Sequence, residues 1–200
     1  MSYPLLREIH QYWFGELKAP GDHLPNTGEL WFRKSDETDR HIREAYEPFI
    51  HEAAGKEWDI ASLTREEGVA LIVLLDQFPR NIFRNSGQQF AFDAKAREIA
   101  MALTSAGLDR FFPIERDLLC LPFQHHEDVG SQDRAVLMAA EMAVSGPESM
   151  RDMHRSFLDF ACKHRDLIRR FGRFPHRNVH LGRNSTLEEL AFIQEHGRGY

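Results

Sequence analysis

Apolar residues recur along this chain at the three- and four-residue spacing of a helix face, and no run alternates strictly as a half-buried strand does. The pattern predicts an all-α protein of about eight helices packed as antiparallel pairs. The predicted helical stretches are 5–13, 42–53, 64–75, 92–103, a short piece after Pro113, 135–142, 150–171 and 185–191. The last stretch is expected to open at a capping box formed by Ser185 and Glu188.

The helix expected over 64–75 has the clearest beginning and the most apolar surface. Thr64 and Glu67 have capping-box spacing, in which each side chain satisfies a backbone N–H of the first turn. The stretch 69–75 is apolar on all sides, so this helix should be central and buried. Pro79 is expected to prevent its regular continuation, because proline lacks the N–H that a helix requires.

The connections between these stretches are mostly short, and none is rich in Pro, Gly or Ser, so residues 1–200 are expected to form a single all-α domain. A net charge of −6 argues against nucleic acid as a partner, because phosphate binding requires a basic surface. The charge is uneven, however. Segment 163–183 holds seven basic residues and one acid, which leaves −12 on the rest of the chain.

The sequence favours a cytoplasmic protein that is not inserted in a membrane. Cys120 and Cys162 lie among apolar neighbours without a Cys-x-x-Cys pair, as reduced core cysteines do. The first residues lack the features of a signal peptide, and no apolar stretch approaches the roughly 20 residues of a membrane-spanning helix. No cofactor motif is present, so no cofactor is expected.

A phrase containing Phe-Pro and Asn follows two predicted helices, as FPRN at 78–81 and FPHRN at 174–178, which suggests that two helix ends present similar polar groups to one place. The candidate binding residues around the first copy are Asp76, Gln77, Arg80, Asn81 and Arg84. In a structural interpretation, Arg80 or Arg84 pairs with Asp76 and Asn81 caps the next turn. In a functional interpretation, one arginine remains available for an anionic ligand.

The second copy lies in a loop after the longest predicted helix, a position where binding residues are common. Its candidate binding residues are Arg173, His176, Arg177, Asn178 and Arg183, with His180 nearby. The segment either forms a solvated basic loop that pairs with acidic surface elsewhere or binds a phosphate or carboxylate. The repetition of the phrase favours the binding site.

His125 and Glu127 are further candidates for the same site, in the segment 124–128. A metal site is not expected there, because adjacent histidines point in different directions and no His-Glu-x-x-His spacing is present. Asp128 is instead expected to cap the helix that begins near Ser131. His164 lies on an apolar helix stripe and is expected to be a hydrogen-bonded core residue, unless it faces the polar cluster.

These residues resemble a family of bacterial and eukaryotic proteins grouped as a domain of unknown function, DUF924. The resemblance covers nearly the whole chain. It rests on Tyr12–Gly15, Leu74–Arg84, Leu121–Phe123 with His125, Glu127, Asp128 and Gln132, and Arg170–Asn178 with Leu181–Arg183. It implies a tetratricopeptide-like helical superhelix, although no such repeat is legible in the sequence. It implies no activity, because the function of the family is not established.

Three functions follow as hypotheses. The first is a binding protein whose arginines converge on a small anionic molecule or on the acidic or carboxylate end of a peptide. The second is an interaction scaffold for a protein partner, in which the two phrases lock helix ends together. The third is a hydrolase-type enzyme in which His125, His164 or His176 acts as acid or base and Asp76 or Glu127 orients it.

Overall fold

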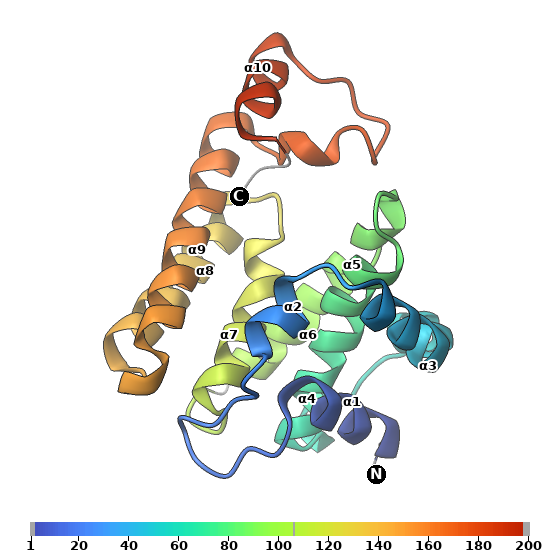
Figure 1. The fold of residues 1–200 in the computed structure, drawn as a ribbon, viewed down its shortest axis with the longest axis vertical. Helices are drawn as coiled ribbons and strands as arrows, with labels where there is room; N and C mark the ends of the chain where they lie inside the picture. Colours follow the sequence, from blue (N-terminus) through green and yellow to red (C-terminus); the bar gives the residue numbers. More distant parts are fainter. Residues whose placement is uncertain (1–2, 106, 198–200) are drawn as a thin grey trace.

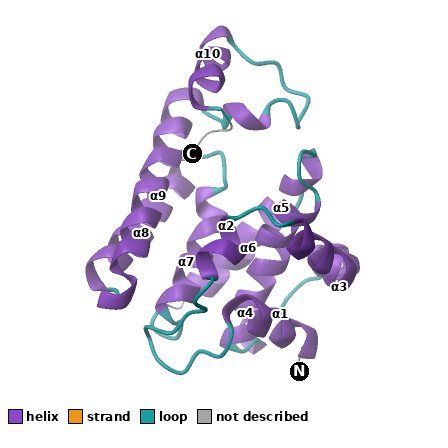
Figure 2. Cartoon of the chain, in the orientation of Figure 1, coloured by secondary structure: helices purple, strands orange, loops and turns teal. Residues whose placement is uncertain are grey.

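The computed structural model describes residues 3–105 and 107–197, and the described residues contain helices and loops but no strand (Figure 2). The all-α prediction is therefore confirmed. The helices of the first half are α1 (Pro4–Phe14), α2 (Thr27–Phe32), α3 (Asp36–Gly55), α4 (Arg65–Ile72), α5 (Phe78–Ile82) and α6 (Asp93–Ser105). Those of the second half are α7 (Pro113–Gln124), α8 (Val129–Ser145), α9 (Arg151–Phe171) and α10 (Leu187–His196).

Short turns of tighter or wider helix lie between these elements. The 3-10 turns are η1 (Ile60–Ser62), η3 (Gly87–Phe90), η4 (Glu148–Met150) and η5 (Pro175–Arg177), and the π-helical turn is η2 (Val73–Gln77). No helix among the described residues has the length and apolar character needed to cross a bilayer.

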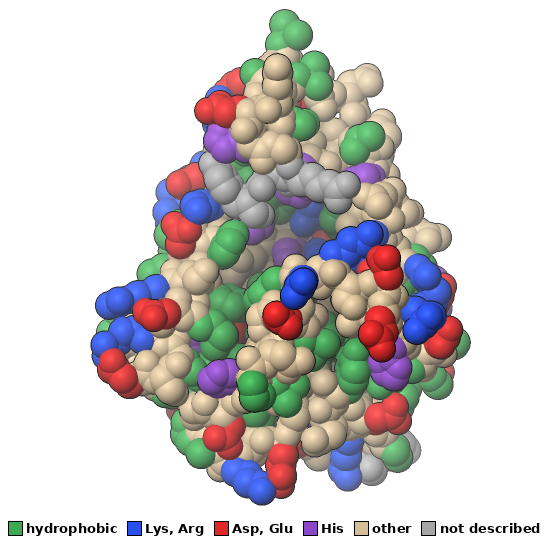
Figure 3. Space-filling view, in the orientation of Figure 1, with side chains coloured by type: hydrophobic (Ala, Val, Ile, Leu, Met, Phe, Trp, Pro, Cys, Tyr) green, Lys and Arg blue, Asp and Glu red, His purple; other side chains and the backbone are tan. Residues whose placement is uncertain are grey.

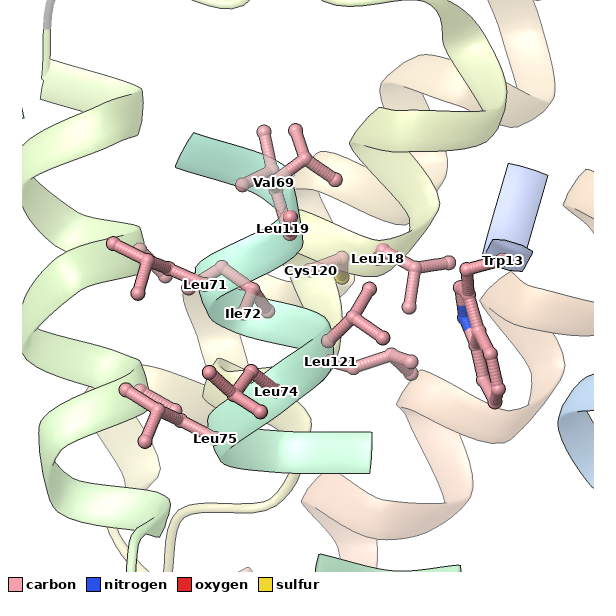
Figure 4. Close-up of a cluster of buried hydrophobic side chains, with 14 of the residues drawn as sticks. Trp13, Val69, Leu71, Ile72, Leu74, Leu75, Leu118, Leu119, Cys120 and Leu121 are labelled. Carbon is pink, nitrogen blue, oxygen red and sulfur yellow. The ribbon is translucent and has the colours of Figure 1, made fainter. Parts of the chain in front are cut away.

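Helix α4 and the turn η2 form the centre of the molecule, as the apolar run predicts. Every residue from Gly68 to Leu75 is buried. Figure 4 shows Val69 and Ile72 of α4 and Leu74 and Leu75 of η2 in one buried cluster with Leu118, Leu119 and Leu121 of α7. Burial of one large aliphatic side chain contributes roughly 1.5–3 kcal/mol, so this segment is a principal source of stability.

The regular α-helix ends before Pro79, as expected, but the chain stays helical through an irregular π turn. Helix α4 widens into η2, in which the N–H of Phe78 donates to the carbonyl of Val73, and α5 then carries Pro79 in its first turn. Proline fits a first turn because its missing N–H would have no partner there. The π turn changes the direction of Asp76 and Gln77, and such turns occur often at functional sites.

The capping predictions are confirmed at two helices and wrong by one residue at a third. Thr64 and Glu67 form the capping box of α4, and Asp128 caps α8 by accepting a hydrogen bond from the Ser131 N–H at 2.8 Å. The box of α10 consists of Thr186 and Glu189, not Ser185 and Glu188. Sequence spacing alone does not separate the two choices, because both place Ser or Thr three residues before Glu.

Helices α8 and α9 lie side by side and run antiparallel, while α10 and η5 lie beyond the end of α9 (Figure 1). A small second apolar cluster holds this end together, and it consists of Leu167, Ile168, Phe174 and Phe192. Helix α9 thereby carries the loop 172–186 across from α5 and η3 (Figure 1). The two Phe-Pro phrases thus come from segments that face one another. The tetratricopeptide-like arrangement and the single domain stay predictions.

Candidate functional site

A buried carboxylate and a histidine form a dyad where η2 meets the end of α7. The Nδ1 atom of His125 lies 2.8 and 2.9 Å from the two carboxylate oxygens of Asp76. The Asp76 side chain is fully buried and also accepts a hydrogen bond from Nε2 of Gln77 at 2.5 Å. The side chain of His125, the residue that follows α7, keeps 16% of its surface exposed. The dyad is therefore anchored inside the protein and open at its histidine end.

The protonation state of the dyad follows from its surroundings. Burial alone would raise the pKa of Asp76, but the charges of Arg80 and His125 and the hydrogen bonds to the carboxylate lower this pKa to about 2. Burial and the charge of Arg80 lower the pKa of His125 below its usual value. A carboxylate only accepts hydrogen bonds, so Nδ1 of His125 carries the proton. Nε2 of the neutral ring is then a free acceptor, with no protein partner among the described residues.

Two arginines share a second buried carboxylate beside the dyad. The guanidinium of Arg80 forms a two-pronged contact with Asp93, at 2.9 and 3.0 Å, and donates to the backbone carbonyl of Asp76 at 2.5 Å. Arg177 contacts the same carboxylate at 3.3 Å. Asp93 lies in the first turn of α6, and Arg177 ends η5, so the contact joins the two Phe-Pro phrases. The two phrases therefore meet, as the sequence suggested, but they do so through Asp93, which belongs to neither of them.

Arg177 is the least satisfied of these groups. Its side chain lies against the rings of Phe90 and Phe174, with the guanidinium carbon 4.3 and 4.6 Å from the ring centroids, and the residue is 7% exposed. Its Nε is buried without a hydrogen-bond acceptor among the described residues. Burial lowers the pKa of Arg177 to about 10, which still leaves it cationic at neutral pH. A buried cation with unused donors is costly unless an anion accepts from it.

His125, Arg80, Arg177 and Phe90 line a cavity of about 450 Å³, which we name the histidine cavity. Four histidines line it: His125 directly after α7, His164 on α9, His176 in η5 and His180 in the loop after η5. Figure 3 shows this face hollowed, with histidine and Lys or Arg atoms visible in the depth. Burial lowers the pKa of both His164 and His176 to about 4, so both rings are neutral at pH 7. Nδ1 of His176 is buried without a partner in the described part of the chain.

Of the residues predicted from the first phrase, Arg84 reaches the wall of the histidine cavity but is already paired. Its Nε and Nη2 donate to Asp39 at 2.5 and 3.0 Å. Asn81 donates to the same carboxylate at 2.9 Å, so it does not cap the next turn. The partner of Asp76 is Arg80, not Arg84, at 3.4 Å. Asp39 thus ties α3 to α5, so Asn81 and Arg84 have a structural role, but through a carboxylate that the sequence interpretation did not name.

Three predicted residues of the second region, together with Glu127, form a set of contacts separate from the histidine cavity. Glu127 accepts from Arg183 at 2.6 and 3.0 Å and from the Phe174 N–H at 2.8 Å. Arg183 also donates to Asn178 at 2.9 Å. Arg173 donates to both carboxylate oxygens of Glu189 at 2.6 and 2.8 Å. These contacts hold the loop 172–186 in place, and they use the donors that the sequence assigned to a ligand.

Sequence reasoning missed Asp93 and Phe90, and it expected His164 to be a core residue. His164 does make a core-type contact, with Nδ1 2.8 Å from the Phe160 carbonyl, yet it also lines the histidine cavity. Asp93 is one acid at the beginning of one helix, and nothing in its neighbourhood marks it as the partner of two distant arginines. Only the position of α6 against η5 reveals its role.

The described residues contain no group of three or more His, Cys, Asp or Glu side chains arranged to hold a metal ion. His126 turns away from His125 and pairs with Asp128, as expected for adjacent histidines. A larger cavity of about 730 Å³ lies near the start of α7. Of the arginines around it, Arg65 is paired with Glu115, Arg116 donates to the Phe111 carbonyl, and Arg110 lies over the ring of Phe111. None of the dyad residues lines this cavity. We therefore place the candidate site at the histidine cavity.

Residues 9–197 match the model of the family described as bacterial protein of unknown function (DUF924). The chain is similar to the solved structure of the protein of unknown function ATU0120 from Agrobacterium tumefaciens, at 33% identity and a TM-score of 0.77. The similarity covers 96% of this chain and 98% of the other. None of the curated proteins matches the chain.

Proposed function

We propose that this chain, which belongs to the DUF924 family, binds a small anionic molecule in the histidine cavity. The observation that carries the proposal is Arg177, a buried guanidinium that makes one hydrogen bond, at 3.3 Å, to a carboxylate already engaged by Arg80. An anion that accepts from Arg177 would compensate its buried charge and use its remaining donors. Carboxylate and phosphate groups match the planar fork of a guanidinium.

The charge balance of the site limits the negative charge that a ligand can bring into it. Asp76 and Asp93 balance Arg80 and Arg177 within the cluster. His125, His164 and His176 are neutral and polar, so they supply hydrogen bonds without adding positive charge. Because Nε2 of His125 is a free acceptor, the ligand must either offer it a hydrogen or be accompanied by protonation of the ring. Binding of a fully ionised anion should therefore take up a proton.

The test is thermal unfolding and calorimetric titration of the purified protein with acetate, benzoate, phosphate and short acidic peptides. A ligand that binds only the folded state at a hundred times its Kd stabilises by about 2.7 kcal/mol. For a protein of this size that corresponds to a rise in Tm of roughly 5–10 °C. The result expected is a shift for at least one monoanion that is lost in Arg177→Gln.

The matched control is Arg169→Gln, which removes a cation from the same basic segment. Arg169 is half exposed, pairs with Asp133 on the surface and does not line the histidine cavity. Arg177→Lys serves if the Gln variant is unfolded, because it keeps the charge and loses the fork. Absence of any shift in the wild type, or an equal shift in the wild type and the Arg177 variants, would contradict the proposal.

A second function, catalysis by the His125–Asp76 dyad, is favoured by the free Nε2 of His125. With Nδ1–H held by Asp76, Nε2 would take a proton from a water molecule as that water attacks an ester carbonyl. The same proton would then pass to the leaving alkoxide, so that water and ester yield acid and alcohol. Arg80 and Arg177 would stabilise the negative charge on the carbonyl oxygen.

A panel of esters, amides and phosphate esters tests this second function. His125→Gln should abolish turnover and preserve binding of the product acid, since Arg177 remains. If no member of the panel turns over with the wild type while anions still bind, the dyad is not catalytic for these reactions and the binding proposal stands.

A further inference from the structure

An apolar groove of about 620 Å³ lies beside the histidine cavity. Its walls come from α2, α7 and α9, and its apolar side chains are Phe32, Leu121, Met153, Phe157 and Phe160. Phe32 is 60% exposed and Phe160 is 42% exposed, whereas Leu121 and Phe157 are buried and Met153 is half-buried. The volume falls in the range of about 300–1,000 Å³ that small-molecule pockets occupy.

The groove and the histidine cavity share walls. His125 and His164 line both of them. A third cavity of about 200 Å³ shares Phe32 and Leu121 with the groove and Arg80 with the histidine cavity. His125 lines all three, so the dyad lies where the apolar and the charged spaces meet.

The polar groups of the groove wall are neutral or already bonded. The hydroxyl of Thr27 donates to the Leu24 carbonyl, and Nε2 of Gln124 contacts the Cys120 sulfur. Nδ1 of His164 lies 2.8 Å from the Phe160 carbonyl, and burial lowers the pKa of His164 to about 4, so this ring is uncharged at neutral pH. The groove therefore offers apolar surface on one side of His125, while the cations lie on the other side.

We propose that the ligand is an amphipathic monoanion, an aliphatic carboxylate whose head group contacts Arg177 and Arg80 and whose chain lies in the groove along α9. The inference rests on the proposed anion site and names the class of molecule that site receives. One molecule with a charged end and an apolar end matches two adjoining spaces of those characters. The exposed phenylalanines would be covered by the chain, which accounts for apolar surface that the described part of the protein leaves uncovered.

The test is calorimetric titration with butyrate, hexanoate and octanoate, and with 1-octanol as a ligand of the same chain length without charge. Each methylene buried in the groove should lower Kd about fourfold, until the groove is filled. 1-Octanol should bind more weakly than octanoate. Arg177→Gln should remove that difference, and Arg177→Lys, used if the Gln variant is unfolded, should reduce it because the charge remains but the fork is lost.

Two variants act on the groove alone. Phe160→Asn removes an exposed apolar wall, and Ser156→Trp fills the groove from an exposed position on α9. Neither residue lines the histidine cavity, so butyrate affinity should be kept while the gain with chain length is reduced. The control is Phe49→Asn, because Phe49 is 37% exposed on α3 and lines a different cavity.

The outcomes separate the two proposals. If butyrate and octanoate bind equally and both depend on Arg177, the anion site stands and the groove does not hold the tail. It would then be a surface for another partner. If octanoate and 1-octanol bind equally and independently of Arg177, the anion site is wrong and the amphipathic inference falls with it. If no carboxylate of the series binds the wild type, the amphipathic inference is overturned, and the anion proposal falls with it if phosphate and the acidic peptides do not bind either.

Discussion

Replacement of Asp76 by Asn should destabilise the protein by removing one charge from a fully buried network. The pKa of Asp76 lies at about 2, against an ordinary value of 3.8. A difference of nearly two pKa units corresponds to roughly 2–3 kcal/mol in favour of the ionised form in the folded protein. Asp76→Asn forfeits this contribution, and its amide also faces the Nε2 donor of Gln77. We expect the free energy of unfolding at pH 7 to fall by about 2–4 kcal/mol.

The pH dependence has a definite sign. A carboxyl whose pKa is lowered on folding contributes stability that is fully present above its unfolded pKa, here about 3.8, and is lost as the pH falls toward 2. The difference between the wild type and Asp76→Asn should therefore be constant from pH 7 to pH 5 and should shrink below pH 4. Urea unfolding followed by circular dichroism at several pH values measures both the magnitude and the trend.

The control is Asp166→Asn on α9. Asp166 is 70% exposed, and its ion pair with Arg165 is long, at 3.8 Å. It should change the free energy of unfolding by less than about 0.5 kcal/mol. A loss in Asp76→Asn as small as that of the control would refute the reasoning. It would mean that the buried network relaxes or admits water when one charge is removed.

Two further predictions concern the contacts of Glu127 and a second buried pair. Glu127→Gln should lower the free energy of unfolding by about 1–2 kcal/mol in urea titrations, because it weakens charge-assisted hydrogen bonds from Arg183 that are partly exposed to solvent. An unchanged free energy of unfolding would show that solvent replaces these hydrogen bonds. Asp117 is buried, and its carboxylate lies 3.4 Å from Nε2 of His154. Burial raises the pKa of Asp117 to about 6, so the stability that its protonated form contributes below pH 4 is lost as the pH rises through 6. Asp117→Asn should therefore raise Tm more at pH 8 than at pH 5 in thermal scans, and an equal effect at both pH values would contradict this.

Local sequence patterns identified the helices that are determined by residues close together in the sequence. The apolar run of α4 must be buried wherever it packs, and the Thr64–Glu67 box closes within one turn. Helix α2 was not predicted, because a stretch of six residues is too short to show the periodic spacing of a helix face. Packing holds it in place, with Trp31 stacked on Trp13 at 6.2 Å between ring centroids.

The sequence by itself determined the all-α class, the central helix and the two polar phrases from which the candidate site is built. Tertiary structure alone decided which polar residues face a cavity and which pair with one another. Arg173 and Arg177 lie four positions apart, yet Arg173 is partly exposed and paired with Glu189, whereas Arg177 is buried beside Asp93. The physical reason is that the partner of each charge comes from a distant segment. Sequence spacing fixes where a side chain leaves its own helix, but only the packing of α6, α7 and α9 fixes what it meets there.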